Sequence, residues 1–288
     1  MTTAPPDGGP TVRRRVLGVE LRRLREDAGV TRQRAGYSIR ASESKISRME
    51  LGQVGFKERD VTDLLNLYGI TERQRCDAFL AMAREANQPG WWQPYNDAVP
   101  VWFRSYVGLE EAAQVIRTYE VQFIPGLLQT EDYARAIMRQ GVGEVPADEL
   151  DRRIELRMRR QKLLTGPDPP HLWAVVDEAA LRRPIGGRHV LKAQIQRLIE
   201  AAQLNHVTLQ VMPFDIGGHA GEAGAFTILR FPEPELPDIV YIEQLTHAVY
   251  LEKPDEVDQY LATMERVSVQ SASPDHTVTF LNQILTAM

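Results

Sequence analysis

The sequence contains a single cysteine, Cys76, among its 288 residues. One cysteine excludes an intrachain disulfide, a cysteine-rich zinc site and a disulfide-stabilised secreted scaffold. Long apolar runs are also missing, and none approaches the roughly 20 residues of a membrane-spanning helix. The opening segment MTTAPPDGGPT has neither the basic start nor the apolar core of a signal peptide. These absences predict a cytoplasmic protein.

Motifs for catalysis are equally scarce. None of the six histidines stands at the HxH, HxxxH or HExxH spacing of a metal site. The segment IGGRHV lacks the Walker lysine and serine and a full GxGxxG pattern. Asp177 and Glu178 are adjacent carboxylates, but neighbours on a strand point to opposite faces, and a helix N-terminus equally favours acidic residues. We therefore expect no catalytic residue, no metal ion and no cofactor.

Positive charge is in deficit over the whole chain but not at its start. The net charge is −5, yet residues 1–60 hold 13 Lys and Arg against 8 Asp and Glu, leaving 21 against 31 for the remainder. Such asymmetry predicts a basic module for an anionic partner, attached to an acidic body with another task. The alternative is that the basic surface is only a solvated face.

Residues 12–86 have the apolar periodicity and the capping residues of five short helices. Thr31 and Ser42 are placed to cap the second and third helices, and Thr71 with Gln74 forms a capping-box pattern that opens the fifth. The first four helices are expected at 12–28, 32–38, 43–51 and 56–68.

The second and third of these helices meet at a tight turn, as a helix-turn-helix requires. Ile46 and Met49 are three residues apart and are predicted to point inward, with Ile39 and Ala35. The outer face then carries polar side chains suited to base edges and phosphates. The candidate DNA-binding residues are Arg32, Gln33, Ser42, Glu43, Ser44, Lys45, Ser47 and Arg48.

The stretch TRQRAGYSIRASESKISRMELG resembles the XRE, or Cro and phage-repressor, helix-turn-helix, most specifically in its ending SKISRMELG. It departs from that family at Gly36, where alanine is usual, and at Arg40, where the turn usually has glycine. The resemblance implies a transcriptional regulator that reads a double-stranded DNA operator. Because repressors of this kind read paired half-sites, we expect a homodimer. The plainer interpretation is a helical bundle with a basic face.

Strand patterns are expected only in the second half of the chain. Before them, we predict helices at 106–119, at 131–140 with Thr130 as its cap, and at 150–164, the last strongly basic. A strand, a helix and a strand followed by hairpins predict a mixed sheet with helices packed on it. The expected strands are 171–176, 207–213, 225–231 and 238–243, with a helix at 190–204.

The segment ANQPGWWQPYNDAVPVWF, rich in proline and tryptophan, separates the two patterns and predicts a domain boundary. We therefore predict a multidomain protein, in which an all-α five-helix module of the XRE type precedes a larger α+β domain. The expected divisions are a disordered tail at 1–10, the DNA-binding module at 11–86, a connector at 87–104 and a sensing or partner-binding domain at 105–288.

Several motifs in order, among them RMRRQKLL, VVDEAALRRPIGG and VTLQVMPFDIGGHAGEAGAFTILRF, resemble the C-terminal domain of actinobacterial WhiJ-like regulators over about residues 90–285. The resemblance implies an antitoxin-like transcription factor, commonly paired with a small BldB-like protein. We accordingly expect a body that receives a signal from a small protein partner or a small ligand. The alternative function is a nucleic-acid-processing enzyme with a catalytic body.

Five residues are candidates for that ligand or partner. The aromatic ones lie near the expected boundary, where large rings also serve simply to seal domains together. His219 lies in a glycine-rich segment that is equally typical of a flexible hairpin connection. The candidates are Trp91, Trp92, Trp102, Tyr106 and His219.

Overall fold

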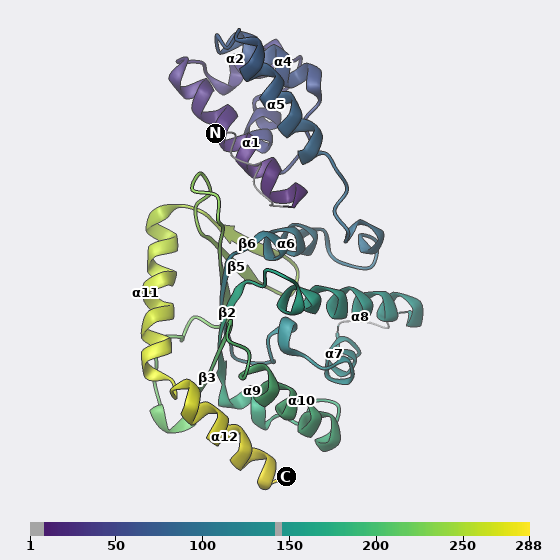
Figure 1. Cartoon of the computed structure of the whole chain (residues 1–288), viewed down its shortest axis with the longest axis vertical. Helices are drawn as coiled ribbons and strands as arrows, with labels where there is room; N and C mark the ends of the chain where they lie inside the picture. Colours follow the sequence, from purple (N-terminus) through teal and green to yellow (C-terminus); the bar gives the residue numbers. More distant parts are fainter. Residues whose placement is uncertain (1–8, 142–145) are drawn as a thin grey trace. The chain divides into compact units, whose positions relative to one another are not determined.

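The computed structural model describes residues 9–141 and 146–288, which form two compact units. The first unit runs to Pro94 and includes two short later segments, Val107–Ala112 and Pro232–Leu236, while the second contains the remainder (Figure 1). The expected disordered tail lies almost entirely outside the described residues, and Pro10 already begins the first helix. None of the helices in these two ranges is long and apolar enough to cross a membrane.

The first unit contains the five predicted helices, so an all-α N-terminal region is confirmed. Their apolar faces converge on one core, in which Leu17, Ile46, Phe56 and Leu64 are almost completely buried. Burial of such side chains is the main stabilising contribution to a small helical domain. The helices are α1 (Pro10–Asp27), α2 (Arg32–Ser38), α3 (Glu43–Glu50), α4 (Glu58–Leu67) and α5 (Arg73–Ala86).

Local capping explains where these helices begin, with one exception. The side chains of Thr31 and Ser42 accept hydrogen bonds from backbone amides in the first turns of α2 and α3, as predicted. The capping box at Thr71 and Gln74 is wrong, because α5 starts at Arg73 with Glu72 as its N-cap and without a side-chain cap. Thr71 therefore precedes the cap and cannot close the box.

The second unit is built on a six-stranded sheet with the order β3-β2-β1-β4-β5-β6. Strands β1, β2 and β3 are parallel, whereas β4, β5 and β6 continue the sheet in antiparallel pairs. The predicted mixed sheet is thus confirmed. Its strands are β1 (Val115–Glu120), β2 (His171–Asp177), β3 (Val207–Met212), β4 (Phe226–Arg230), β5 (Ile239–Glu243) and β6 (Ala248–Leu251).

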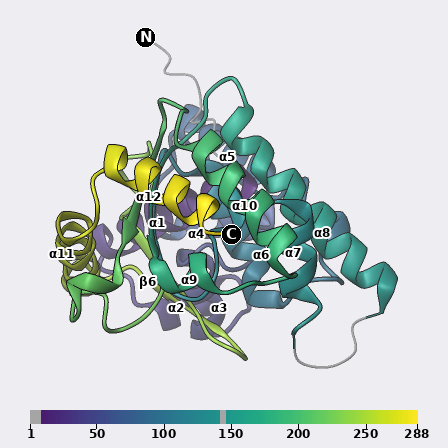
Figure 2. The same ribbon diagram turned by 90° about the horizontal axis from the view of Figure 1, so that it is seen from below.

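Helices cover both faces of this sheet. Figures 1 and 2 show α11 on one face and α7, α8 and α10 on the other. On the α11 side, Tyr119 and Phe226 of the sheet share a buried core with Met264 and Val267 of α11. The helices are α6 (Val101–Ala112), α7 (Glu131–Met138), α8 (Ala147–Gln161), α9 (Glu178–Arg182), α10 (Arg188–Ala201), α11 (Pro254–Gln270) and α12 (Pro274–Thr286).

The expected helix at 106–119 is confirmed only as far as Ala112 and is wrong beyond it. Helix α6 begins earlier, at Val101 inside the predicted connector, and the end of the expected segment is the central strand β1. A central strand is covered on both faces and so lacks the clean polar alternation that marks a half-buried strand. Helices α11 and α12 and strand β6 had no counterpart in the expected elements.

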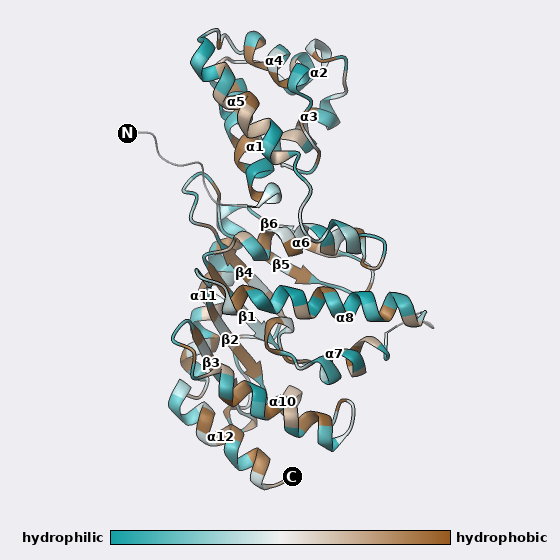
Figure 3. Ribbon diagram, turned by 45° about the vertical axis from the view of Figure 1, so that its right-hand side comes forward, coloured by the Kyte–Doolittle hydropathy of each residue, from teal (hydrophilic) through white to brown (hydrophobic). Residues whose placement is uncertain are grey.

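Helix α8 confirms the predicted basic amphipathic helix. Its hydrophilic side is prominent in Figure 3, while Leu150, Ile154 and Leu156 are buried. Arg157 donates to the side chain of Gln129 at 2.6 Å, and the guanidinium of Arg160 lies over the rings of Phe103 and Tyr106. The helix therefore contributes both apolar packing and positive charge to the second unit.

Candidate nucleic-acid interface

The inner side of α3 fixes its position in the first unit. Ile46 and Met49 are buried with Ala35 and Ile39, as the three-residue spacing predicts. Glu43, Ser44 and Arg48 are exposed on the opposite side, and Ser47 is partly exposed. The helix therefore presents a short polar face flanked by one guanidinium, which is the composition that reads base edges in a major groove.

Lys45 is placed differently from its neighbours. Its ammonium group lies 2.6 Å from Asp60 Oδ2, and this ion pair joins α3 to α4. Asp60 itself is buried, and burying an unpaired carboxylate costs free energy, so the ion pair with Lys45 offsets that cost. Lys45 can reach DNA only by giving up or sharing this contact, whereas Arg48 is not held by any ion pair among the described residues.

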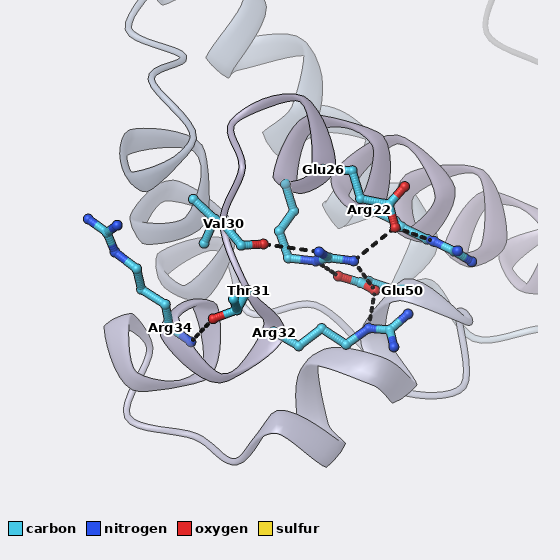
Figure 4. Close-up of polar contacts among 8 residues, drawn as sticks. Arg22, Glu26, Val30, Thr31, Arg32, Arg34 and Glu50 are labelled. Carbon is cyan, nitrogen blue, oxygen red and sulfur yellow. Dashed lines mark hydrogen bonds and ion pairs between the residues drawn. The ribbon is translucent and has the colours of Figure 1, made fainter.

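A buried ion-pair network holds the C-terminus of α3 against α1 (Figure 4). Arg25 Nε lies 2.5 Å from Glu50 Oε1, and another Arg25 nitrogen donates to the carbonyl of Val30 at 3.0 Å. The hydrogen bond to Glu50, followed in importance by its charge, raises the pKa of Arg25 above its usual value against the effect of burial. Glu50 thus fixes α1, α3 and the segment before α2 together.

Arg32 belongs to the same network. Its Nε donates to Glu50 Oε2 at 2.9 Å, while about a third of its side chain remains exposed. Gln33, by contrast, is exposed at the start of α2. Arg32 therefore has a structural contact besides the DNA contact predicted from the sequence.

The turn between α2 and α3 explains the glycine at position 36 and shows the conformational cost of arginine at position 40. A Cβ at Gly36 would lie 2.8 Å from the carbonyl oxygen of Ala41, so the turn packs directly on the α2 backbone. Arg40 has a φ of 55°, and it is the one non-glycine residue with positive φ in the described part of the chain. The strain that glycine usually avoids is therefore present at Arg40.

Replacing Arg40 with glycine is expected to stabilise the first unit by about 0.5 to 1 kcal/mol. Removal of the Cβ relieves the left-handed strain, and the greater freedom of glycine in the unfolded chain offsets part of that gain. Urea unfolding of the full protein measures the change. Arg40→Ala keeps the strain and serves as the control, so equal stability of the two variants would contradict this explanation.

Three exposed residues near this interface were not among the candidate DNA-binding residues predicted from the sequence. Arg34, Tyr37 and Arg40 lie on the outer side of α2 and the turn, and Tyr37 is 86% exposed. Their spacing of three residues was the available signal, because such residues share one side of a helix. Two guanidinium groups and a phenol there are suited to contacts with phosphates.

Comparison with known families gave two matches. A model described as a helix-turn-helix domain matches residues 16–77, which include all of α2, α3 and α4. A domain of unknown function, DUF5753, matches residues 103–283, more than half of the chain. The chain belongs to the DUF5753 family. No curated protein and no solved structure matched it.

For this DUF5753 protein, the helix-turn-helix match supports a DNA-binding regulator. The match to DUF5753 assigns no activity, so the role of the second unit has to be argued from its own residues. The predicted ligand or partner residues are divided between the two units. Trp91 and Trp92 belong to the first unit, where their rings meet edge to face, whereas Trp102 and Tyr106 belong to the second.

His219 lies within the DUF5753 region, in the segment between β3 and β4. The Gly221 amide donates to His219 Nδ1 at 3.1 Å, which places the proton of the neutral ring on Nε2. That nitrogen is 3.4 Å from Tyr119 Oη and 3.8 Å from Asp177 Oδ2. Burial, and then the Asp177 carboxylate, raise the pKa of Tyr119. His219 therefore connects its loop to the ends of β1 and β2.

The neighbouring carboxylates of the DUF5753 region have separate structural partners. Asp177 accepts a hydrogen bond from the Ala179 amide and caps α9, in agreement with the helix N-terminus considered from the sequence. Glu178 forms an ion pair with Arg182 and accepts a hydrogen bond from the Phe214 amide. The two carboxylates thus face different groups.

Proposed function

We propose that the chain is a sequence-specific DNA-binding transcriptional regulator that reads its operator with α3. The outer face of α3 carries this proposal: Ser44 and Arg48 are exposed there while Ile46 and Met49 anchor the same helix in the core. Arg48 is the best candidate for a bidentate contact to guanine. Arg34 and Arg40, on the adjoining helix and turn, are placed to hold the phosphate backbone.

Replacing Arg48 with alanine is expected to cost about 1 to 3 kcal/mol of discrimination at one base pair, because that is the contribution of a good bidentate contact. The operator is first selected from a pool of random duplexes with the full protein. Fluorescence anisotropy titrations then compare the wild type with Arg48→Ala. We expect Lys45→Ala to have a smaller effect on discrimination, since Lys45 is paired with Asp60.

Arg73→Ala is the matched control, because that side chain is 96% exposed on α5, outside the helix-turn-helix pair. Its operator affinity should equal that of the wild type at the same salt concentration. Operator affinity of Arg48→Ala that equals this control would remove α3 as the reading element. Degradation of the duplex during the titration would instead support the nucleic-acid-processing enzyme considered from the sequence.

We further propose that the protein acts as a homodimer. We also propose that its second unit receives a signal, which is either a small ligand or a small BldB-like protein. The protein would then be an antitoxin-like regulator of the WhiJ-like type. One recognition helix covers few base pairs, which supports paired half-sites. Light scattering with and without the operator tests the dimer, and a monomer in both conditions would contradict it. Calorimetry with a purified small BldB-like protein tests the protein partner, and absence of binding would contradict it.

A further inference from the structure

The two cations of α3 are held in different ways. Lys45 and Arg48 are three residues apart, so they are neighbours on the surface of the helix. Arg48 is exposed, whereas only 31% of the Lys45 side chain is. The Lys45 ammonium donates to Asp60 Oδ2 at 2.6 Å, which turns this side chain toward α4. One positive charge of the reading helix is therefore taken up by a contact inside the first unit.

Asp60 is built into the fold as an acceptor for this ammonium. It lies in the first turn of α4, and only 12% of its side chain is exposed. A carboxylate in the first turn of a helix is favoured by the unpaired amides there. Hydrogen bonds between an ammonium and a carboxylate are also about twice as strong as those between neutral groups. Lys45 has to leave this acceptor before its ammonium can contact another anion.

The place of Lys45 in α3 shows what a released ammonium would do. Lys45 is the third residue of the helix, and its amide donates to the capping hydroxyl of Ser42 at 3.3 Å. The N-terminal turn of a helix attracts phosphate and disfavours cations, so the charge of Lys45 is compensated here by Asp60 and not by the helix. Because lysine has a flexible four-carbon stem, a released Lys45 can follow a phosphate near this end of α3.

A free lysine at this position would add affinity without adding sequence information. Contacts to phosphate hold a protein on DNA but do not distinguish one base pair from another. They supply nearly all of the affinity for random DNA, against which a regulator has to discriminate. On random DNA the helix can shift until a free ammonium meets a phosphate, whereas a base contact by Arg48 fixes its placement on the operator. Release of Lys45 would therefore favour random DNA more than the operator.

We propose that Asp60 is a positioning residue for DNA recognition, which holds the Lys45 ammonium against α4 and so withholds one positive charge from sequence-independent binding. This inference rests on the proposed function as a sequence-specific regulator. It limits the DNA contact predicted for Lys45 from the sequence to complexes in which Asp60 has released the ammonium. Discrimination then depends on Arg48, while Lys45 adds little to the attraction for an arbitrary duplex.

Asp60→Asn tests the restraint, because asparagine has nearly the same shape as aspartate but carries no charge. Fluorescence anisotropy titrations of the full protein use the selected operator and a scrambled duplex of the same length. Binding to the scrambled duplex should become more salt-dependent, with a slope of log Kobs against log salt that is steeper by about 0.9, as one added phosphate contact requires. Between about 50 and 200 mM salt, this adds roughly a threefold loss of affinity. The preference for the operator should fall.

Two controls separate the release of Lys45 from the general change in charge. Asp77→Asn also removes one negative charge, but from α5, where this side chain is 69% exposed and pairs with Arg73 at 4.0 Å. This variant should keep the wild-type slope. Combining Asp60→Asn with Lys45→Gln should remove the added slope, since the gain acts through the lysine. Urea unfolding shows whether each variant is folded.

A second comparison does not require any change at Asp60. Arg34 is exposed on α2, where it is placed to hold the phosphate backbone. Arg34→Gln should make the slope for the scrambled duplex shallower by about 0.9. Lys45→Gln should change this slope less, because the ammonium that it removes is already paired. This difference tests the restraint even if Asp60→Asn does not fold.

An unchanged slope in folded Asp60→Asn would overturn the proposal, as would equal steepening in Asp77→Asn. Equal changes in Lys45→Gln and Arg34→Gln would show that Lys45 already contacts phosphate. A weaker operator complex with unchanged binding to the scrambled duplex would show that Asp60 holds Lys45 onto a base, which also contradicts the restraint. A wild type that prefers no sequence refutes the proposed function itself. A wild type that prefers its operator and fails these tests refutes only the role of Asp60.

Discussion

Replacing Glu50 with alanine is expected to lower the free energy of unfolding of the first unit by about 3 to 5 kcal/mol. The reason is that the Arg25 guanidinium, with only 8% of its side chain exposed, would lose its buried carboxylate partner and keep only the exposed Glu26 at 3.2 Å. The hydrogen bond from Arg32 would be lost at the same time. Urea unfolding measures the loss, and hydrogen exchange of the amides in α1 to α3 assigns it to this unit.

Two further variants separate the buried charge from the loss of packing. Removing both charges in the pair Arg25→Met and Glu50→Leu should recover much of the stability, since a well-packed apolar pair can replace a buried ion pair. Glu58→Ala breaks an exposed ion pair with Arg84 and should leave stability nearly unchanged. If Glu50→Ala were as mild as Glu58→Ala, the network in Figure 4 would not hold α3 in place.

Replacing Gly18 with alanine is expected to destabilise the first unit by about 2 to 3 kcal/mol. The new Cβ would lie 2.5 Å from the carbonyl oxygen of Glu50 and 2.6 Å from that of Met49, so α1 and α3 would have to separate. In a helix without that contact, the same change would stabilise by about 1 kcal/mol. The sign of the measured change therefore reports directly on the close approach of the two helices.

Gly69→Ala is the control for this prediction. Gly69 has a φ of 81° and no atom within 4 Å of its missing Cβ, so its replacement introduces backbone strain without a collision. We expect Gly69→Ala to cost about 1 kcal/mol. Urea unfolding compares the two variants, and a stabilised Gly18→Ala protein would show that α1 and α3 do not touch at this point. Operator affinity should fall with Gly18→Ala, because α3 is displaced.

Features set by neighbouring residues were predictable from the sequence. Thr31, Ser42 and Thr130 cap their helices because a side-chain oxygen reaches an amide two or three positions later, which requires no knowledge of the rest of the fold. The inner face of α3 was predictable for the same reason, since Ile46 and Met49 are one turn apart. The exposed face, and hence most of the candidate DNA-binding residues, follows from it.

Features set by distant residues were not predictable. Strand β1 pairs with β2 on one side and with β4 on the other. The residues of β1 itself, Val115–Glu120, do not indicate either partner. The same holds for the ion pair of Lys45 with Asp60. Each depends on a register or a helix contact that only the folded chain defines.

The central place of β1 has a consequence for the order in which the chain acquires structure. Its two neighbours in the sheet begin at His171 and Phe226, so β1 stays unpaired until long segments that follow it have been synthesised. Formation of such non-local pairs is slow, whereas helices that contact their sequence neighbours form quickly. Helices α1 to α5 can therefore complete their shared core before β4 has been synthesised, so α3 can reach its final position before the sheet is able to close.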